Sequence, residues 1–166
     1  MKLHKNREEF EQLITLTARS VGIPETAVRK DYYIVLLLDK LAESDYVNEC
    51  VFKGGTSLSK CYPGSIDRFS EDIDITYFPK EEFSDKQYDR ALKRIESVMA
   101  GDANIEKIGY ERNDRNKSSF IWFEGEDKET TKVKLEIGSS VRPDPYELHE
   151  FKSYIQEYLE ATGNND

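Results

Sequence analysis

The feature that most constrains this chain is a Gly-Gly turn that is followed by an acidic strand. Residues 50–53 (Cys-Val-Phe-Lys) are predicted to form a short strand that ends at Gly54-Gly55, and residues 56–61 to form a short helix. After a Pro-Gly turn, residues 72–78 alternate from Asp-Ile-Asp-Ile onward and are predicted to form a second strand. The fold must therefore accommodate a strand, a tight turn, a short helix and an acidic strand in that order.

The acidic strand presents two carboxylates on one face of a sheet. Because side chains at i and i+2 of a strand point the same way, Asp72 and Asp74 project together, about 7 Å apart along the strand axis. Ile73 and Ile75 then point into the core and fix the orientation of the strand. This arrangement predicts a site for Mg²⁺ or Mn²⁺ that is held by the two aspartates.

A third carboxylate is expected on a neighbouring strand, because sites that activate an attacking oxygen and stabilise a leaving pyrophosphate bind metal through several ligands. Glu136 is the best candidate. The apolar side chains of residues 133–137 alternate away from it, which places Lys132, Lys134 and Glu136 on one face. An exposed Glu136 that pairs with Lys134 or Lys132 across the sheet is an equally good interpretation.

The glycine turn offers a site for phosphate groups. Gly54 and Gly55 let a ligand approach the backbone closely, and N–H groups at the start of the following helix can donate to phosphate oxygens. Cations near the turn can neutralise charge that develops on a triphosphate. The residues predicted to bind a nucleotide in this way are Gly54, Gly55, Thr56, Ser57, Lys60 and Arg68, with Lys53 beside them.

Each motif also has a purely structural interpretation. A Gly-Gly pair alone is usually only a turn, and an Asp-x-Asp pair alone is usually a solvated strand face. The ordering of the two motifs is much rarer than either motif by itself, and it favours a nucleotide and metal site. His4 and His149 are interpreted as surface residues, because no catalytic constellation converges on them in the sequence.

The remaining segments predict an α+β fold with a mixed sheet flanked by helices. Lys30-Asp31 are expected on the side of the second helix that lies opposite its apolar residues, and Ser84 is expected to cap a later helix. Outside the glycine turn, the expected elements are helices at 10–21, 25–41, 85–99 and 146–159, and strands at 105–112, 119–124 and 131–139, with a hairpin loop at 125–129.

Length and composition favour one domain over residues 1–166, with 37% hydrophobic residues to form a core. The predicted domain consists of N-terminal helices at 1–45, a core sheet at 49–140 and a C-terminal helix at 146–160. No apolar run approaches the length of a membrane span, so no membrane association is expected. Cys50 and Cys61 lack metal-type spacing and are interpreted as reduced thiols of a cytoplasmic protein.

Charge neither requires nor forbids a nucleic-acid partner. The net charge of −9 opposes simple phosphate binding, which needs lysine and arginine. Positive charge is nevertheless clustered locally, for example at Lys128, Lys132 and Lys134.

The central segment resembles the nucleotidyltransferase superfamily, whose signature is a glycine turn followed by Asp-x-Asp or Asp-x-Glu. More narrowly, residues 52–60 (Phe-Lys-Gly-Gly-Thr-Ser-Leu-Ser-Lys) and residues 68–75 (Arg-Phe-Ser-Glu-Asp-Ile-Asp-Ile) are similar to the AbiEii / MenT-type toxin family. Residues 29–33 (Arg-Lys-Asp-Tyr-Tyr) are also similar to the N-terminal helix of that family. The resemblance covers roughly residues 20–140.

The resemblance implies a nucleotidyltransferase-like sheet and Mg²⁺-dependent transfer of an NMP from an NTP to an acceptor hydroxyl, such as the 3′ end of tRNA or another RNA. It implies the toxin of an abortive-infection or type IV toxin–antitoxin pair, with a cognate antitoxin as partner. By motif, residues 54–57 bind the nucleotide phosphates, Asp72 and Asp74 are catalytic and bind metal, and Glu136 takes the third carboxylate position.

One departure from the family keeps an alternative open. Family members are usually much longer, with a helical C-terminal domain that adds a lysine and an aspartate to the active site. The chain is therefore interpreted as an N-terminal fragment or a minimal form, with the helix at 146–160 as the start of that domain. The alternative function is an NTP-binding, antitoxin-docking module without transferase activity, and a plain α+β domain with an incidental acidic strand is a third hypothesis.

Overall fold

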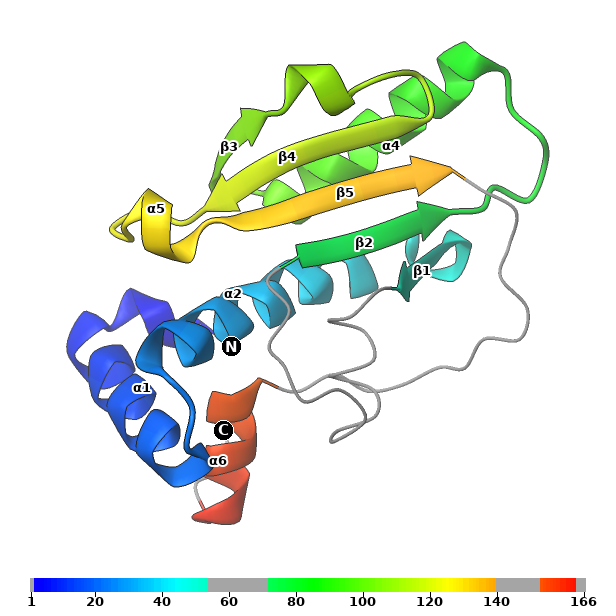
Figure 1. Ribbon diagram of the computed structural model, residues 1–166. Coiled ribbons are helices and arrows are strands. Elements are labelled where there is room, and N and C mark those ends of the chain that lie inside the picture. The colour runs from blue at the N-terminus through cyan, green and yellow to red at the C-terminus, as the bar shows by residue number, and fades with distance from the viewer. Residues whose placement is uncertain (1, 54–71, 140–152, 164–166) are drawn as a thin grey trace.

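A five-stranded mixed sheet organises the structure (Figure 1). The computed structural model describes residues 2–53, 72–139 and 153–163. The strands lie in the order β1-β2-β5-β4-β3, in which β2 and β5 run parallel and the other neighbours run antiparallel. Their bounds are β1 (Cys50–Lys53), β2 (Asp72–Tyr77), β3 (Asn104–Lys107), β4 (Asn116–Trp122) and β5 (Val133–Ser139). The predicted mixed sheet is confirmed.

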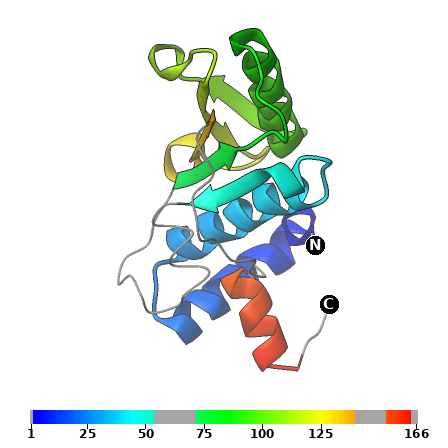
Figure 2. The same ribbon diagram turned by 90° about the vertical axis from the view of Figure 1, so that its right-hand side faces the viewer.

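Helices pack on one face of this sheet. They are α1 (Arg7–Val21), α2 (Glu25–Ala42), α4 (Asp85–Ala100), α5 (Lys128–Thr131) and α6 (Tyr154–Ala161), with 3-10 turns η1 (Leu3–Lys5), η2 (Val47–Glu49) and η3 (Gly109–Glu111). Figure 1 shows α4 and α2 behind the strands, and the two helices contact each other. Figure 2 shows α1 and α6 side by side at the end of the molecule opposite α4. Among the described residues, none of the helices combines the length and the apolar character that crossing a membrane requires.

Local signals explain where the long helices begin and end. The Asn6 side chain caps α1 by accepting a hydrogen bond from the Glu9 N–H, and Gly22 ends the helix with φ of 81°. Ser84 and Gln87 form a capping box at the start of α4, as the sequence predicted for Ser84.

The core joins the inner face of the sheet to α2 and α4. Ile73 and Ile75 of β2 are 0% and 2% exposed, and Leu135 and Ile137 of β5 are also buried. These residues belong to the same apolar cluster as the buried side chains of α2 and α4. We call the opposite side the outer face. It carries the residues that alternate with the buried ones, namely Asp72, Asp74, Asn116, Ser118, Phe120, Trp122, Lys134 and Glu136.

The strand predicted at 105–112 is shorter in the structure. β3 stops at Lys107, and the chain turns through η3 before β4 begins. The Arg112 guanidinium donates to both carboxylate oxygens of Glu96 at 2.8 and 2.9 Å and to the Ser118 carbonyl at 3.0 Å. These charge-assisted contacts stabilise the turn in place of a longer strand. The hairpin predicted at 125–129 is present, with α5 inserted before β5.

The prediction for Lys30 and Asp31 was wrong, because both residues are buried, at 8% and 1% exposure. A carboxylate oxygen of Asp31 accepts a hydrogen bond from the Tyr154 N–H at 2.7 Å, at the start of α6. The partner lies 123 residues away in the sequence, so a local pattern could not reveal it. Of the helix predicted at 146–159, the structure describes the part from Tyr154; residues 146–152 lie outside the described residues.

His4 is also placed differently from the prediction. Its ring packs against four aromatic rings, those of Phe10, Tyr32, Tyr33 and Phe123. Its Nδ1 atom lies 2.9 Å from the Tyr32 hydroxyl. Burial lowers the pKa of His4 below its usual value, and Lys5 acts in the same direction. His149 lies outside the described residues.

Candidate active site

Strand parity and register bring the predicted carboxylates to the outer face. Asp72 and Asp74 alternate with the buried Ile73 and Ile75 in β2. In the parallel pairing of β2 with β5, Asp74 lies beside Glu136, with about 4.8 Å between the two backbones. The structure thus shows the predicted same-face placement, while the roles of these residues in catalysis and metal binding stay predictions.

The acidic positions belong to two rows that cross the sheet. The first row, which we call the Glu136 row, contains Lys53, Asp74, Glu136 and Ser118. The second, which we call the Lys134 row, contains Asp72, Lys134, Phe120 and Glu106. Both rows carry carboxylates and Lys134 adds a cation in the second row, so the outer face can bind both a cation and an anion.

Hydrogen bonds orient Glu136 from the side of β4. The buried Ser118 hydroxyl donates to Oε1 of Glu136 at 3.5 Å. The Asn116 amide in turn donates to the Ser118 hydroxyl oxygen at 3.3 Å and to the Glu111 carbonyl at 2.8 Å. This network restricts the Glu136 carboxylate while leaving it half-buried on the outer face, in the central strand of the sheet.

Lys134 supplies positive charge among these carboxylates. Its ammonium donates to Oε1 of Glu111 at 3.0 Å, so it does not make the ion pair with Glu136 that was the alternative interpretation. The hydrogen bond with Glu111 raises the pKa of Lys134, and the charges of Glu136 and Asp72 raise it further. Sequence reasoning placed Lys134 on this face without giving it a role in the site. Its spacing of two residues from Glu136 was the available signal.

The donor set fits a hard divalent cation, because carboxylate oxygens are the ligands that Mg²⁺ and Mn²⁺ prefer. Asp74 and Glu136 are neighbours in register, and Asp72 shares their face. Within residues 2–53, 72–139 and 153–163, no three His, Cys, Asp or Glu side chains converge closely enough to hold a metal ion. The carboxylates therefore share one face without forming a closed cage.

The predicted phosphate-binding residues Gly54, Gly55, Thr56, Ser57, Lys60 and Arg68 lie outside the described residues, as does Cys61. The chain reaches them from Lys53 at the end of β1, whose partner across the sheet is Asp74. The described backbone therefore enters the glycine segment beside the Glu136 row.

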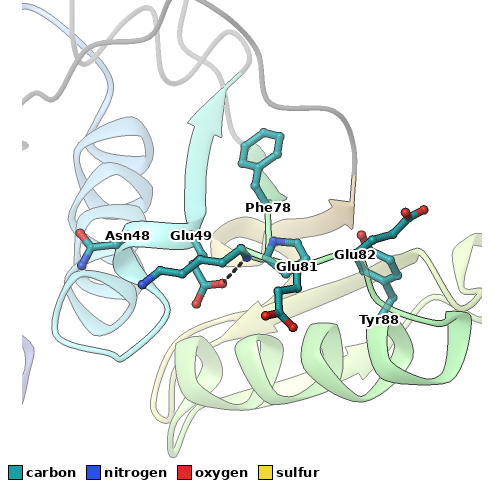
Figure 3. Close-up of a pocket in the computed structure, with 8 residues that line it drawn as sticks. Asn48, Glu49, Phe78, Glu81, Glu82 and Tyr88 are labelled. Atoms are coloured by element: carbon teal, nitrogen blue, oxygen red, sulfur yellow. Dashed lines mark hydrogen bonds between the residues drawn. The ribbon is translucent and has the colours of Figure 1, made fainter.

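A pocket of about 470 Å³ opens at the other end of β2 (Figure 3). It is lined by Asn48, Glu49, Phe78, Pro79, Lys80, Glu81, Glu82 and Tyr88. The Glu49 carboxylate accepts a hydrogen bond from the Lys80 N–H at 3.2 Å. Phe78 follows the end of β2, about 20 Å along the strand direction from Asp72. Asp72, Asp74 and Glu136 are not among the described residues that line this pocket, so it lies apart from these carboxylates.

Comparisons with known proteins identify a matching family and a similar fold. The family described as "Nucleotidyl transferase AbiEii toxin, Type IV TA system" matches residues 35–163. Among solved structures, the chain is similar to MenT4, a nucleotidyltransferase toxin from Mycobacterium tuberculosis H37Rv, with 23% sequence identity and a TM-score of 0.58. The similarity covers 84% of this chain and 48% of MenT4, so the chain spans about half the length of that toxin. A comparison with curated protein sequences finds no match.

The family match extends over most of the chain, including β2 with its two aspartates and β5 with Glu136. The similarity to MenT4 supports the same fold. On these grounds the chain belongs to the AbiEii family of nucleotidyltransferase toxins of type IV toxin–antitoxin systems.

Proposed function

We propose that this chain carries the nucleotide and metal site of an enzyme that transfers an NMP from an NTP to an acceptor hydroxyl. The observation that carries this proposal is the shared outer face of Asp72, Asp74 and Glu136, with Asp74 and Glu136 side by side on parallel strands. The buried Ile73 and Ile75 hold the two aspartates in position. Family membership supports the reaction class.

In the proposed reaction the acceptor oxygen attacks the α-phosphorus of the NTP. A new P–O bond forms, the bond to pyrophosphate breaks, and the proton of the acceptor passes to Glu136 or to water. Asp72, Asp74 and Glu136 would hold Mg²⁺ or Mn²⁺, which stabilises charge on the attacking and leaving oxygens when bound. Residues 54–57, Lys60 and Arg68 are proposed to bind the triphosphate.

Lys134 adds a cation to the proposed site. Its ammonium lies in the field of Asp72, Glu136 and Glu111. A fixed positive charge at this position limits the repulsion between the carboxylates. It can also attract the phosphates of an incoming nucleotide. The acceptor is proposed to be RNA, with the 3′ end of tRNA as the first candidate, and a cognate antitoxin is the proposed partner in the cytoplasm.

The test is incubation of the protein with labelled NTPs, Mg²⁺ and total tRNA. We expect labelled RNA with the wild type and none with Asp72→Asn or Asp74→Asn. Glu81→Gln, in the pocket at the far end of β2, is the matched control and is expected to label RNA as the wild type does. Equal labelling by the aspartate variants, or no labelling with any NTP, would count against the proposal.

The second candidate function is an NTP-binding, antitoxin-docking module that does not transfer. The observation that favours it is that, among the described residues, no three His, Cys, Asp or Glu side chains converge closely enough to hold a metal ion. Calorimetry with each NTP and Mg²⁺ separates the two functions. Tight binding that needs Asp72 and Asp74, without any labelled product, would favour the module over the enzyme.

A further inference from the structure

Two aromatic side chains of β4 extend the outer face away from the carboxylates. In the Lys134 row, Phe120 follows Asp72 and Lys134 across the sheet, so its backbone lies about 10 Å from that of Asp72. Trp122 lies two residues farther along β4 on the same face, which places it about 7 Å beyond Phe120. The rings therefore form a continuous strip with the candidate active site.

These rings are not part of the apolar core. Ile121 of the same strand and Phe123, which follows the end of the strand, belong to the core cluster, whereas Phe120 and Trp122 do not. Both rings of the strip are half-buried. Both rings therefore stay partly accessible on a polar sheet face, where a ligand can reach them.

A lysine ammonium lies over each ring of the strip. Nζ of Lys132 is 4.5 Å from the centre of the Phe120 ring, and Nζ of Lys128 is 4.7 Å from the Trp122 ring. Both lysines come from the segment around α5, which joins β4 to β5. The strip thus combines ring faces for stacking with cations for phosphates, the combination that binds single-stranded nucleic acid.

The lysines of the strip are free to change partners at low cost. Lys128 pairs with Glu106 at 2.7 Å and Lys132 with Glu129 at 3.6 Å. All four side chains are about one-third exposed or more, and exposed ion pairs of this kind contribute little to stability. An incoming phosphate can therefore draw each ammonium off its ring and expose the ring face to a base.

We propose that the strip of Phe120, Trp122, Lys128 and Lys132 binds a single-stranded RNA segment, with bases stacked on the two rings and phosphates held by the two lysines. The identity of the RNA as acceptor rests on the proposed function. The binding itself does not, because it needs neither NTP nor Mg²⁺. The chain carries a net charge of −9, so stacking must supply much of the affinity and selects single strands over duplexes.

The test uses fluorescence of Trp122, the only tryptophan in the chain, together with anisotropy of a labelled RNA. The probe is a single-stranded oligoribonucleotide of about ten nucleotides, added without NTP or Mg²⁺. We expect it to change the Trp122 emission and to bind more tightly than the same sequence as a duplex. Phe120→Leu, which keeps an apolar side chain but removes the ring, is expected to weaken binding by about 5- to 100-fold.

Two further variants separate stacking from charge. Lys132→Gln is expected to weaken RNA binding. It is also expected to reduce the salt dependence of binding by the amount that corresponds to about one lost phosphate contact. Lys107→Gln removes an exposed lysine on the opposite side of the same sheet and is expected to leave binding unchanged. Circular dichroism of each variant confirms that it folds.

Three results would overturn the proposal. The first is RNA binding that Phe120→Leu and Lys132→Gln leave unchanged in folded protein. The second is equal binding of duplex RNA or heparin, which would show that backbone charge alone is bound. The third is a change in Trp122 emission that depends only on protein concentration, which would assign the strip to contact between copies of this chain. A failure of RNA labelling with normal oligonucleotide binding would reject the proposed function and leave the strip intact.

Discussion

Two glutamates of this protein, Glu126 and Glu136, show how the same side chain serves two purposes. The Glu126 side chain is 2% exposed, and it accepts hydrogen bonds from Arg7 at 2.5 Å and from Arg29 at 3.3 Å. Glu136 is half-buried, and it accepts a 3.5 Å hydrogen bond from Ser118 while its neighbour Lys134 donates to Glu111. Two arginines neutralise the first carboxylate, whereas the second keeps the capacity to bind a further cation.

The contrast assigns Glu126 to the fold and leaves Glu136 as a residue of the proposed site. Glu126 ties the loop after β4 to α1 and α2, and Arg29 also makes two bonds to Glu11 at 2.6 and 2.7 Å. Loss of the Glu126 charge is costly because the buried side chain loses its charge-assisted hydrogen bonds, although both arginines keep Glu11 as a partner. A carboxylate like Glu136 adds little to folding, and the four predictions that follow test this division.

The largest expected effect is on nucleotidyl transfer. Glu136→Gln keeps the shape of the side chain but removes the charge, and we expect it to lower the rate by at least about 100-fold, because metal-assisted stabilisation is lost. Glu126→Gln, measured at a temperature at which it is folded, is expected to keep activity close to that of the wild type. Comparable losses of transfer activity in both variants would contradict the division between a structural Glu126 and a functional Glu136.

The next largest effect is on stability, where we expect the Glu126 variant to lose more than the Glu136 variant. Glu126→Gln is expected to lower the free energy of unfolding by about 2 kcal/mol, because the buried side chain loses its charge-assisted hydrogen bonds to Arg7 and Arg29. Glu136→Gln is expected to change it by no more than about 0.5 kcal/mol. Urea denaturation followed by circular dichroism measures both. An equal loss of stability in Glu136→Gln would make that residue structural.

A smaller effect is expected from Ser118, which orients Glu136. Ser118→Ala removes the hydroxyl and is expected to weaken Mn²⁺ binding by about tenfold, as measured by calorimetry. Ser119→Ala is the matched control, since its buried hydroxyl points to the inner face and has no hydrogen-bond partner. We expect Mn²⁺ binding by this control to match the wild type; identical affinities in all three proteins would mean that Ser118 does not position Glu136.

The smallest effect concerns pH and the aromatic cluster around His4. Burial lowers the pKa of His4 below 6.5 in the folded protein, so the unfolded chain takes up its proton first as the pH falls. The stabilisation is therefore complete above about pH 6.5 and is lost as the pH falls through the folded-state value. We expect unfolding curves of the wild type to show a larger loss of stability between about pH 7 and pH 5 than those of His4→Asn. Parallel pH profiles of the two proteins would show that the cluster does not disfavour the charged imidazole.

Much of the fold followed from the sequence because its signals are local. The capping box at Ser84, the glycine that ends α1 and the alternation in β2 and β5 each depend on residues close together in the chain. The bend after β3 was missed because Arg112 is held by Glu96, on a helix that packs across the sheet. The burial of Asp31 was missed for the same kind of reason, since its partner Tyr154 comes from the other end of the chain.

By itself, the sequence determined that Asp72, Asp74 and Glu136 point away from the core, because the two-residue period of a strand is a property of neighbouring residues. Only the tertiary structure decided which strands lie side by side, and so placed Asp74 next to Glu136 and Phe120 next to Lys134. It also decided which carboxylates are neutralised. Arg7 and Arg29 reach Glu126 across 119 and 97 residues of sequence, and the electrostatic field at a carboxylate depends on distance in space, whatever the separation along the chain.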